Sequence, residues 1–524
     1  RFTHVALLLA MFGPSLVHGS KRFLADGAKY HHAQINSTAF RDDIVSAMDF
    51  MLGCGGQVAS QKAHTIQKIL APMWRTLPKT TDHEHIDRRS LRYLVHRYFM
   101  KTSSLMIRGF EPSRLVNESH WGVADILSQM VPAFVESVLE APHAKNIGFS
   151  ITDAVHMVVM LEQLLFDSES TLLGKVYQDQ HKPMQRSLSY SGLKQVLEQY
   201  LVEWLVDGDE DDMKMLAANR TLTQEVVPHF EELVKFMEGR INTLLYTRWQ
   251  GVSKNGGKDL WASKFSFADA HEIVGDITRS FASYWQSECD VMKLSLVAMD
   301  THNTGRVPLS KFYNQAISTD WRFGESEAYL RELGALDESS TQIGPQVIIP
   351  NYIQATSNCI VSTSHYLVCC ASECESLMGD IELTIGAPMA FPEELIAVVG
   401  NMTAETTVDD DDFPMLEGAL ADQLDQIAEK HGGKVPLHGR LFAQWLHYVF
   451  PRECPFPHRI GMVSAVTPAQ YGDEYIATSS DMRKLASNAT ASDIPIAVAK
   501  EELEWMSQWS PEEEFMVDYS SEFG

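Results

Sequence analysis

Apolar side chains recur every three or four residues along most of the chain, as at Ile66, Leu70 and Met73. This spacing gathers them on one face of an α-helix, so the pattern predicts a mainly α, multi-helical protein. Alternation of the kind found in strands is confined to short segments such as residues 346–349. The predicted helices cover residues 39–52, 61–77, 86–102, 122–139, 152–166, 192–206, 226–247, 267–299, 325–336, 365–381, 392–401, 415–431 and 437–449.

Changes in composition predict where the chain divides. Residues 251–264 are rich in glycine and polar side chains, as is typical of a linker. The expected order is a signal peptide over 1–19, a helical domain over 20–250, the linker over 251–264, a central domain with a cysteine-rich helix over 265–401, a C-terminal helical segment over 402–460 and an irregular tail over 461–524. Phe149 and Phe265 are both followed by Ser-x-x-Asp, which we interpret as two similar helix starts rather than a duplication.

The central domain contains a loop over residues 300–311, which follows a predicted helix and reads Asp-Thr-His-Asn-Thr-Gly-Arg-Val-Pro-Leu-Ser-Lys. Asp300 is the first residue of this loop, and Gly305 is the sixth, where the chain must turn sharply. Val307 is the eighth, where paired loops form a short β-bridge. The segment resembles an EF-hand, the helix–loop–helix unit that binds calcium. The resemblance covers roughly residues 280–356 and implies a pair of such units.

A second, altered copy follows the first. Residues 345–352 align with residues 305–312, which places Val347 opposite Val307. The resemblance therefore implies that these two valines pair. A third echo, Gly-Lys-Val-Pro-Leu at residues 433–437, repeats the Gly-Arg-Val-Pro-Leu of the first loop. No acidic loop precedes it, so we interpret it as a turn of similar geometry.

The resemblance implies a calcium site whose ligands this sequence has largely lost. An EF-hand loop supplies oxygen atoms at positions one, three, five and nine and a bidentate glutamate at position twelve. Here His302, Pro308 and Lys311 occupy positions three, nine and twelve, and an ammonium group at position twelve repels Ca²⁺. We therefore expect no cofactor, with calcium as the alternative. The loop residues concerned are Asp300, His302, Thr304, Arg306 and Lys311.

A separate acidic segment offers another ion site. Asp207, Asp209 and Asp211 stand at alternate positions after a predicted helix. Position six lacks the glycine and position twelve lacks the acid of an EF-hand loop. A solvated acidic loop explains these residues better.

Five of the seven cysteines are candidates for disulfide bonds: Cys359, Cys369, Cys370, Cys374 and Cys454. In an oxidising compartment we expect most of them to be paired. Cys369 and Cys370 would point in different directions on a helix, so we expect them to have different partners. The alternative is a zinc site formed by Cys370, Cys374, Cys454 and His458.

The N-terminal residues indicate the secretory pathway. A short basic start, an apolar run over residues 5–12 and small residues before Ser20 are typical of a signal peptide. The chain begins with Arg1 rather than Met, so we expect an incomplete N-terminus. No stretch is apolar enough to span a membrane, although an anchor can lie beyond the C-terminal residue. The Asn-x-Ser/Thr acceptor of N-glycans occurs at Asn36, Asn117, Asn219, Asn401 and Asn488.

The formal net charge of −26 argues against nucleic acid as a partner, because such a surface repels phosphate groups. The local motifs of α/β-hydrolases, zinc proteases and dinucleotide-binding enzymes are absent from the sequence. We therefore favour a luminal, extracellular or cell-surface glycoprotein with a structural or interaction role, no catalysis and an unknown protein or glycan partner. The alternatives are a calcium-responsive binder and a helical metal-dependent enzyme.

Overall fold

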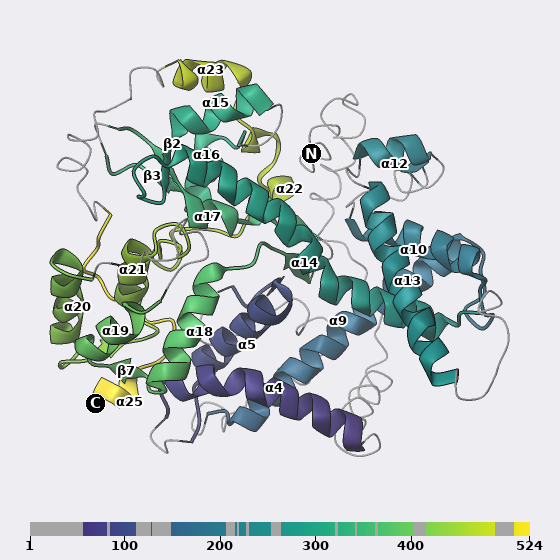
Figure 1. Ribbon diagram of the computed structural model, residues 1–524, viewed down its shortest axis with the longest axis horizontal. Helices are drawn as coiled ribbons and strands as arrows, with labels where there is room; N and C mark the ends of the chain where they lie inside the picture. Colours follow the sequence, from purple (N-terminus) through teal and green to yellow (C-terminus); the bar gives the residue numbers. More distant parts are fainter. Residues whose placement is uncertain are drawn as a thin grey trace, which may run out of the picture. The chain divides into compact units, whose positions relative to one another are not determined.

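The computed structural model describes most of the chain from residue 56 onward (Figure 1). The signal peptide, the helices predicted over 39–52 and 122–139, the acidic residues 207–211 and the acceptors Asn36, Asn117 and Asn488 lie outside the described residues. The described residues are 56–80, 84–111, 127, 148–205, 215–216, 219–226, 230–252, 264–319, 323–340, 343–361, 365–402, 414, 416–487 and 508–523.

The mainly helical architecture is confirmed. Contacts divide the chain into two compact units that are discontinuous in sequence. The first unit includes Leu161–Tyr284 and Ile360–Val368, and the second includes Thr38–Met160, Trp285–Cys359 and Cys369–Gly524. Two long helices, α9 (Ile151–Asp179) and α14 (Phe267–Met299), contain the boundaries between the units.

The first unit is built from helices around a buried aromatic and aliphatic core. Trp204 and Phe281 meet edge to face, with ring centroids 4.9 Å apart. A short hairpin pairs Ile360 with Val368. The elements of this unit are the C-terminal part of α9, α10 (Tyr190–Leu205), α12 (Arg220–Val226), α13 (Phe230–Val252), the N-terminal part of α14, β5 (Ile360–Val361) and β6 (Tyr366–Val368).

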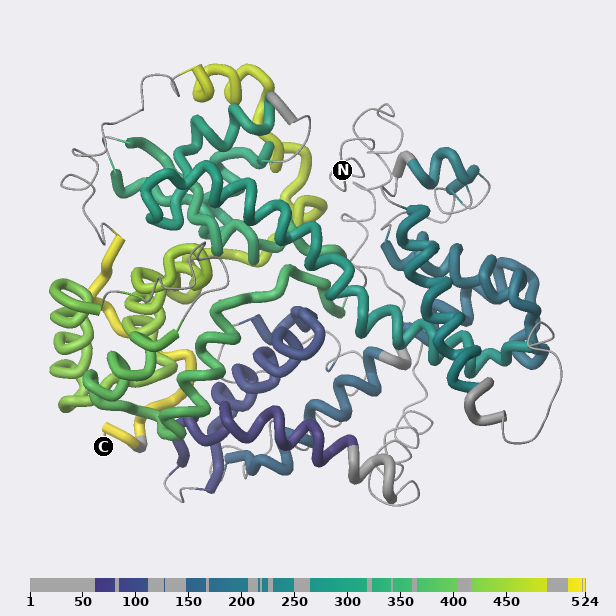
Figure 2. Tube along the Cα trace, in the orientation of Figure 1, coloured from purple at the N-terminus to yellow at the C-terminus, as the bar shows by residue number. Residues whose placement is uncertain are grey.

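The second unit begins with three mutually packed helices: α4 (Gly56–Thr76), α5 (Arg88–Ser103) and α18 (Glu373–Ile385). Its last described segment, drawn in yellow, runs beside α21 (Arg440–Val449), where Arg440 N donates to Glu514 O (Figure 2). Its remaining elements are β1 (Leu105–Ile107), β2 (Arg306–Pro308), α15 (Leu309–Thr319), α16 (Glu327–Glu332), β3 (Leu336–Asp337), β4 (Gln346–Ile348), α17 (Ile349–Ile353), η5 (Thr356–Asn358), β7 (Met389–Ala390), α19 (Pro392–Val399), α20 (Ala419–Lys430), β8 (Val435–Pro436), α22 (Pro468–Tyr471), η6 (Asp473–Tyr475), α23 (Ser479–Ala486) and α25 (Ser520–Phe523).

One local pattern recurs through the described residues: a helix, a loop, a residue in an antiparallel β-bridge, and a second helix. The bridges join these loops in pairs. In seven of the eight loops the following helix starts two residues after the bridging residue, and α21 is the exception. The bridging pairs are Ile86 with Phe149, Leu188 with Phe265, Val307 with Val347, and Ala390 with Val435.

This pattern changes the interpretation of the similarity between Phe149 and Phe265. Each is the second bridging residue of its pair and precedes a long helix. The capping boxes are also alike: Ser150 N donates to Asp153 Oδ2 at 2.8 Å, and Ser266 N donates to Asp269 Oδ2 at 2.6 Å. The two segments therefore hold equivalent places in a repeated unit and are more than two similar helix starts.

One expectation for local structure is corrected. The helix predicted over 365–381 begins at Glu373, because Tyr366–Val368 form a fully buried strand rich in β-forming residues. Cys370 therefore precedes the helix and does not share a helix face with Cys374. In the segment 433–437, interpreted as a turn of similar geometry to the first loop, Val435 bridges Ala390 as Val307 bridges Val347.

Candidate functional site

The segment that resembles an EF-hand pair has its two loops bridged as expected. Strand β2 pairs antiparallel with β4, and Val307 lies opposite Val347, which confirms that pairing. The expected packing of the flanking helices is present: Leu296 and Phe312 are fully buried, and the Phe312 and Tyr352 rings meet edge to face at 5.3 Å. The loops are thus held in register by a β-bridge and by an aromatic core.

Asp300, the first residue of the loop, is buried, and its carboxylate accepts hydrogen bonds from four different donors. The backbone N–H groups of Thr304 and Gly305 donate to its carboxylate at 3.1 and 2.9 Å, and the Thr304 hydroxyl donates at 3.3 Å. Arg452 Nε donates to Asp300 Oδ2 at 2.9 Å. Arg452 Nη2 donates to Asp300 O at 2.9 Å and to Asn303 Oδ1 at 2.7 Å. One guanidinium group therefore binds three oxygen atoms of the loop.

The turn that carries Arg452 is docked tightly on this loop. Gly305 has φ +69°, and a Cβ atom there would lie 1.9 Å from Pro451 O, so no other residue fits without a backbone shift. Lys293 Nζ lies 3.7 Å from the buried carboxylate of Glu453 and 2.6 Å from Glu373. We call residues 451–454 the Arg452 turn.

In the second loop, too, a buried carboxylate is paired with an arginine. Asp337 is 1% exposed, and Arg306 Nε donates to its Oδ2 at 2.6 Å. Ser339 donates to Asp337 Oδ1 through both its N–H and its hydroxyl, at 2.9 and 2.6 Å. Arg306 also donates to Thr304 O at 3.1 Å. Each loop of the pair thus contains a buried carboxylate that is neutralised by a guanidinium group.

The other predicted loop residues play smaller parts. His302 is exposed and Lys311 is half-buried, and within the described residues neither forms an ion pair or hydrogen bond with Asp300. Sequence reasoning placed Arg306 in the loop but did not pair it with Asp337. It missed Arg452 altogether, since no local pattern connects a residue this far along the chain to the loop.

The expected disulfides are present, and each of the five candidate cysteines is paired. The bonds are Cys289–Cys370, Cys359–Cys369 and Cys374–Cys454. Cys369 and Cys370 have different partners, as expected. Cys289 was missed because it lies inside the predicted helix 267–299. The zinc alternative is wrong, because three of its four ligands are in disulfides and His458 Nε2 donates to Gly334 O at 2.7 Å.

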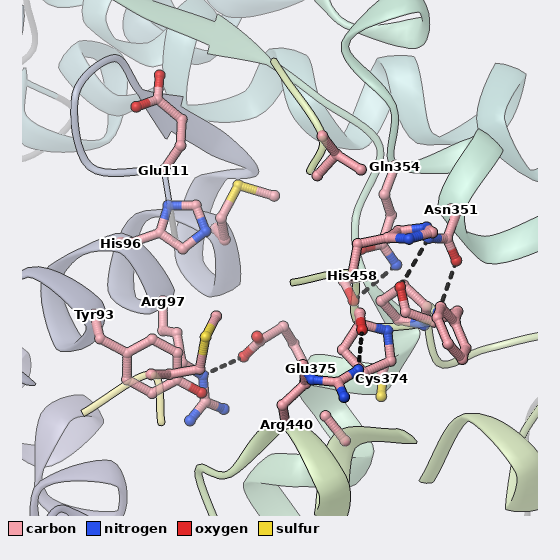
Figure 3. Close-up of a pocket in the computed structure, with 18 of the residues that line it drawn as sticks. Tyr93, His96, Arg97, Glu111, Asn351, Gln354, Cys374, Glu375, Arg440 and His458 are labelled. Atoms are coloured by element: carbon pink, nitrogen blue, oxygen red, sulfur yellow. Dashed lines mark hydrogen bonds and ion pairs between the residues drawn. The ribbon is translucent and has the colours of Figure 1, made fainter. Parts of the chain in front are cut away.

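A cavity of about 400 Å³ lies in the second unit (Figure 3). Tyr93, His96 and Arg97 of α5 form one wall, and Asn351, Gln354 and His458 form the opposite wall. Glu375 reaches across from α18, and Arg97 Nε donates to its Oε2 at 2.7 Å. Arg97 is buried and also pairs with the buried Glu382. Of these residues, sequence reasoning named only His458, as a ligand of the alternative zinc site, because the wall combines segments that are far apart in the chain.

Three further features bear on function. The described residues contain no group of three or more His, Cys, Asp or Glu side chains placed to hold a metal ion. No described helix combines the length and apolar character needed to cross a membrane. Asn219 and Asn401, the two glycan acceptors within the described residues, are both exposed.

Comparison with known proteins adds no relative: no family model, curated protein or solved structure matches the chain. The geometry of the loops and of the cavity is therefore the basis for a functional proposal.

Proposed function

We propose that the protein is a calcium-independent interaction protein without catalytic activity, built from degenerate EF-hand-like pairs and made in the secretory pathway. One observation carries the proposal. The Arg452 guanidinium binds Asp300 Oδ2, Asp300 O and Asn303 Oδ1, three oxygen atoms of the first loop. A resident positive charge at this place opposes a divalent cation by electrostatic repulsion.

The second loop supports the same conclusion. Asp337 is the buried carboxylate of that loop, and Arg306 already compensates its charge. A buried carboxylate is costly unless it is paired, so both loops can remain folded without an ion. The pair would then act as a fixed support for the surfaces of its helices, with no opening or closing driven by calcium.

The repeated helix–loop–bridge–helix pattern extends the proposal along the chain. Four bridged pairs occur in the described residues, where the sequence had indicated one. Successive pairs share helices: α9 ends the first pair and begins the second, and α14 ends the second and begins the third. An array of this kind offers a large helical surface for a protein or glycan partner. The three disulfides and the exposed acceptors Asn219 and Asn401 support the secretory part of the proposal.

Thermal unfolding in millimolar Ca²⁺ and in a chelator tests the calcium part. We expect the melting temperature of the native protein to be the same in both conditions. A variant with His302→Asp, Pro308→Asp, Lys311→Glu and Arg452→Gln should gain several degrees in Ca²⁺, because it regains oxygen ligands and loses the competing guanidinium. Binding to the folded state alone stabilises by about 2.7 kcal/mol at a hundredfold excess of ligand over Kd.

Different outcomes would contradict the calcium independence and the EF-hand-like geometry of the loop. A calcium-dependent rise in the native protein that Asp300→Ala abolishes would establish the calcium-responsive alternative. A folded four-substitution variant that ignores Ca²⁺ would show that the loop does not have EF-hand geometry. The variant with the three loop substitutions and Arg452 intact is the matched control, and we expect it to respond more weakly because the guanidinium still competes.

A further inference from the structure

The open polar groups of the cavity are hydrogen-bond acceptors. Glu375 Oε2 accepts from Arg97, while the side chain remains 27% exposed and lines the cavity. His458 Nε2 donates to Gly334 O, which leaves Nδ1 of the neutral ring as an acceptor. Gln354 Nε2 donates to Ser372 Oγ at 3.0 Å and leaves its Oε1 available. Figure 3 shows Glu375 on one side of the cavity and Gln354 and His458 on the other.

Most guanidinium N–H groups of the wall donate within the protein. Arg97 donates to Glu375 and Glu382, and Arg440 donates to the carbonyl groups of Pro457, Ser510 and Glu512. Three nitrogen atoms of the wall, His96 Nδ1, Arg97 Nη2 and Arg440 Nε, have no hydrogen-bond partner. Each of these atoms is buried with less than 1 Å² exposed, so a molecule in the cavity does not reach them.

The charges around the cavity favour a cation. Three carboxylates line it, from Glu111, Glu375 and Glu514, against the two guanidinium groups of Arg97 and Arg440. Burial lowers the pKa of His96 to about 4, and burial also lowers the pKa of His458. Both rings are therefore neutral near pH 7 and add no positive charge. Arg97 also pairs with the buried Glu382, so the charge of this guanidinium is compensated within the protein.

The rest of the wall is apolar and adaptable. Thioether side chains are flexible and fit ligands of varied shape, and aromatic faces attract cations. A volume of about 400 Å³ is within the range of small-molecule sites. The main apolar contributors are Met100, Met106, Met378, Met516, Phe442 and Phe456.

We propose that this cavity binds a small organic cation: an ammonium group on an apolar body, with the charged group at Glu375 and its N–H groups shared among Glu375, Gln354 and His458. The apolar body lies against the methionine and phenylalanine side chains. This proposal uses no calcium site, so its failure and the failure of the function proposed above can be distinguished.

Calorimetric titration of the full chain near pH 7.5 with matched probes tests the charge preference. Phenethylammonium and hexylammonium carry the proposed charge, while 3-phenylpropionate and hexanoate have similar bodies and the opposite charge. We expect one site per chain for the ammonium probes and at least tenfold weaker binding of the carboxylates. Equal binding of both charges, or no binding of either ammonium probe at millimolar concentration, overturns the proposal.

Substitutions locate the site. Ala443→Phe on α21 places a ring in the cavity and should abolish binding, while Ala397→Phe on the exposed face of α19 is the control for the same change elsewhere. Glu375→Gln should weaken ammonium binding at least tenfold. Glu373→Gln is its matched control, because Glu373 is on the same helix, pairs with Lys293 and does not line the cavity.

The outcomes are decisive even if one variant folds poorly. Circular dichroism checks each fold, and Gln354→Met replaces Glu375→Gln if the latter disturbs Arg97. Gln354→Met removes an acceptor without changing charge and should weaken binding severalfold. Unchanged ammonium binding in a folded Ala443→Phe protein, or in the folded acceptor variant, shows that the probes bind elsewhere and contradicts the proposal.

Discussion

Two loops of the second unit share a five-residue pattern and differ in their surroundings. Residues 305–309 read Gly-Arg-Val-Pro-Leu, and residues 433–437 read Gly-Lys-Val-Pro-Leu. Both glycines have positive φ, +69° and +93°. Val307 and Val435 are fully buried, and each bridges an antiparallel partner. The common pattern thus forms the same local backbone in both places.

The contacts made by the two loops have little in common. Gly305 is pressed against Pro451 O, whereas a Cβ atom on Gly433 would meet nothing within 4 Å. Arg306 is buried against Asp337, whereas Lys434 is exposed and its ammonium lies 4.8 Å from the Phe391 ring centroid. Local sequence therefore determines the turn, and segments from elsewhere in the chain determine whether its charges are buried and paired.

The two glycines give the largest expected difference. Gly305→Ala should reduce the free energy of unfolding by about 5 kcal/mol, because it combines a positive φ with a clash against the backbone of the Arg452 turn. Gly433→Ala should cost about 1–2 kcal/mol, the price of the left-handed conformation alone. Chemical denaturation of both variants measures the difference. Equal costs would mean that the Arg452 turn is not docked on the loop.

The two basic residues give the next largest difference. Arg306→Met leaves the buried Asp337 carboxylate without its cation and should cost about 3–4 kcal/mol. Lys434→Met removes an exposed ammonium and should change stability by less than about 0.5 kcal/mol. The double variant Arg306→Met/Asp337→Leu should recover much of the loss, because no buried charge remains. Failure of this recovery would contradict the role given to the ion pair.

A buried carboxylate without a paired cation shows what the arginines prevent. Glu169 in the first unit is 3% exposed and accepts a hydrogen bond from the Tyr366 hydroxyl at 3.2 Å. Burial raises the pKa of Glu169 to about 7, from 4.5 in the unfolded chain. The protonated form is therefore favoured by folding. Its stabilising contribution is complete below pH 4.5 and is lost as the pH rises through 7.

Glu169→Gln should remove this pH dependence. The neutral amide cannot ionise. From pH 4.5 to pH 8 the native protein should therefore lose about 3 kcal/mol more of its free energy of unfolding than the variant loses. Denaturation at several pH values measures the change, and Glu272→Gln at an exposed position of α14 is the control. Parallel pH profiles for the native and Glu169→Gln proteins would refute the assignment.

The sequence predicted the local structure well. The helix over 267–299 follows from apolar periodicity, and the bridge between Val307 and Val347 was implied by the resemblance to an EF-hand pair. The helix over 365–381 was predicted incorrectly at its start, because a fully buried run such as Tyr366–Val368 has the same apolar character in a strand as in a helix. The discontinuous units were not visible in composition, since their boundaries fall within continuous helices.

The contacts at the Asp300 loop and in the cavity could not be predicted from the sequence. Arg452 forms an ion pair with Asp300 because the tertiary fold brings two distant segments together. The sequence around either residue does not indicate this partner. The cavity likewise combines Arg97, Glu375 and His458 from three distant segments. Sequence spacing specifies neighbours within one helix or loop, while these partners are specified by tertiary packing.

Counting the calcium ions bound to the folded protein tests the central claim most directly. The claim is that a guanidinium group has replaced the cation in the loop at Asp300. Equilibrium dialysis of the native chain against millimolar Ca²⁺ should give the same low value as the Asp300→Ala variant, because both lack a site at this loop. One or more ions bound per native chain, and lost on Asp300→Ala, would contradict the account.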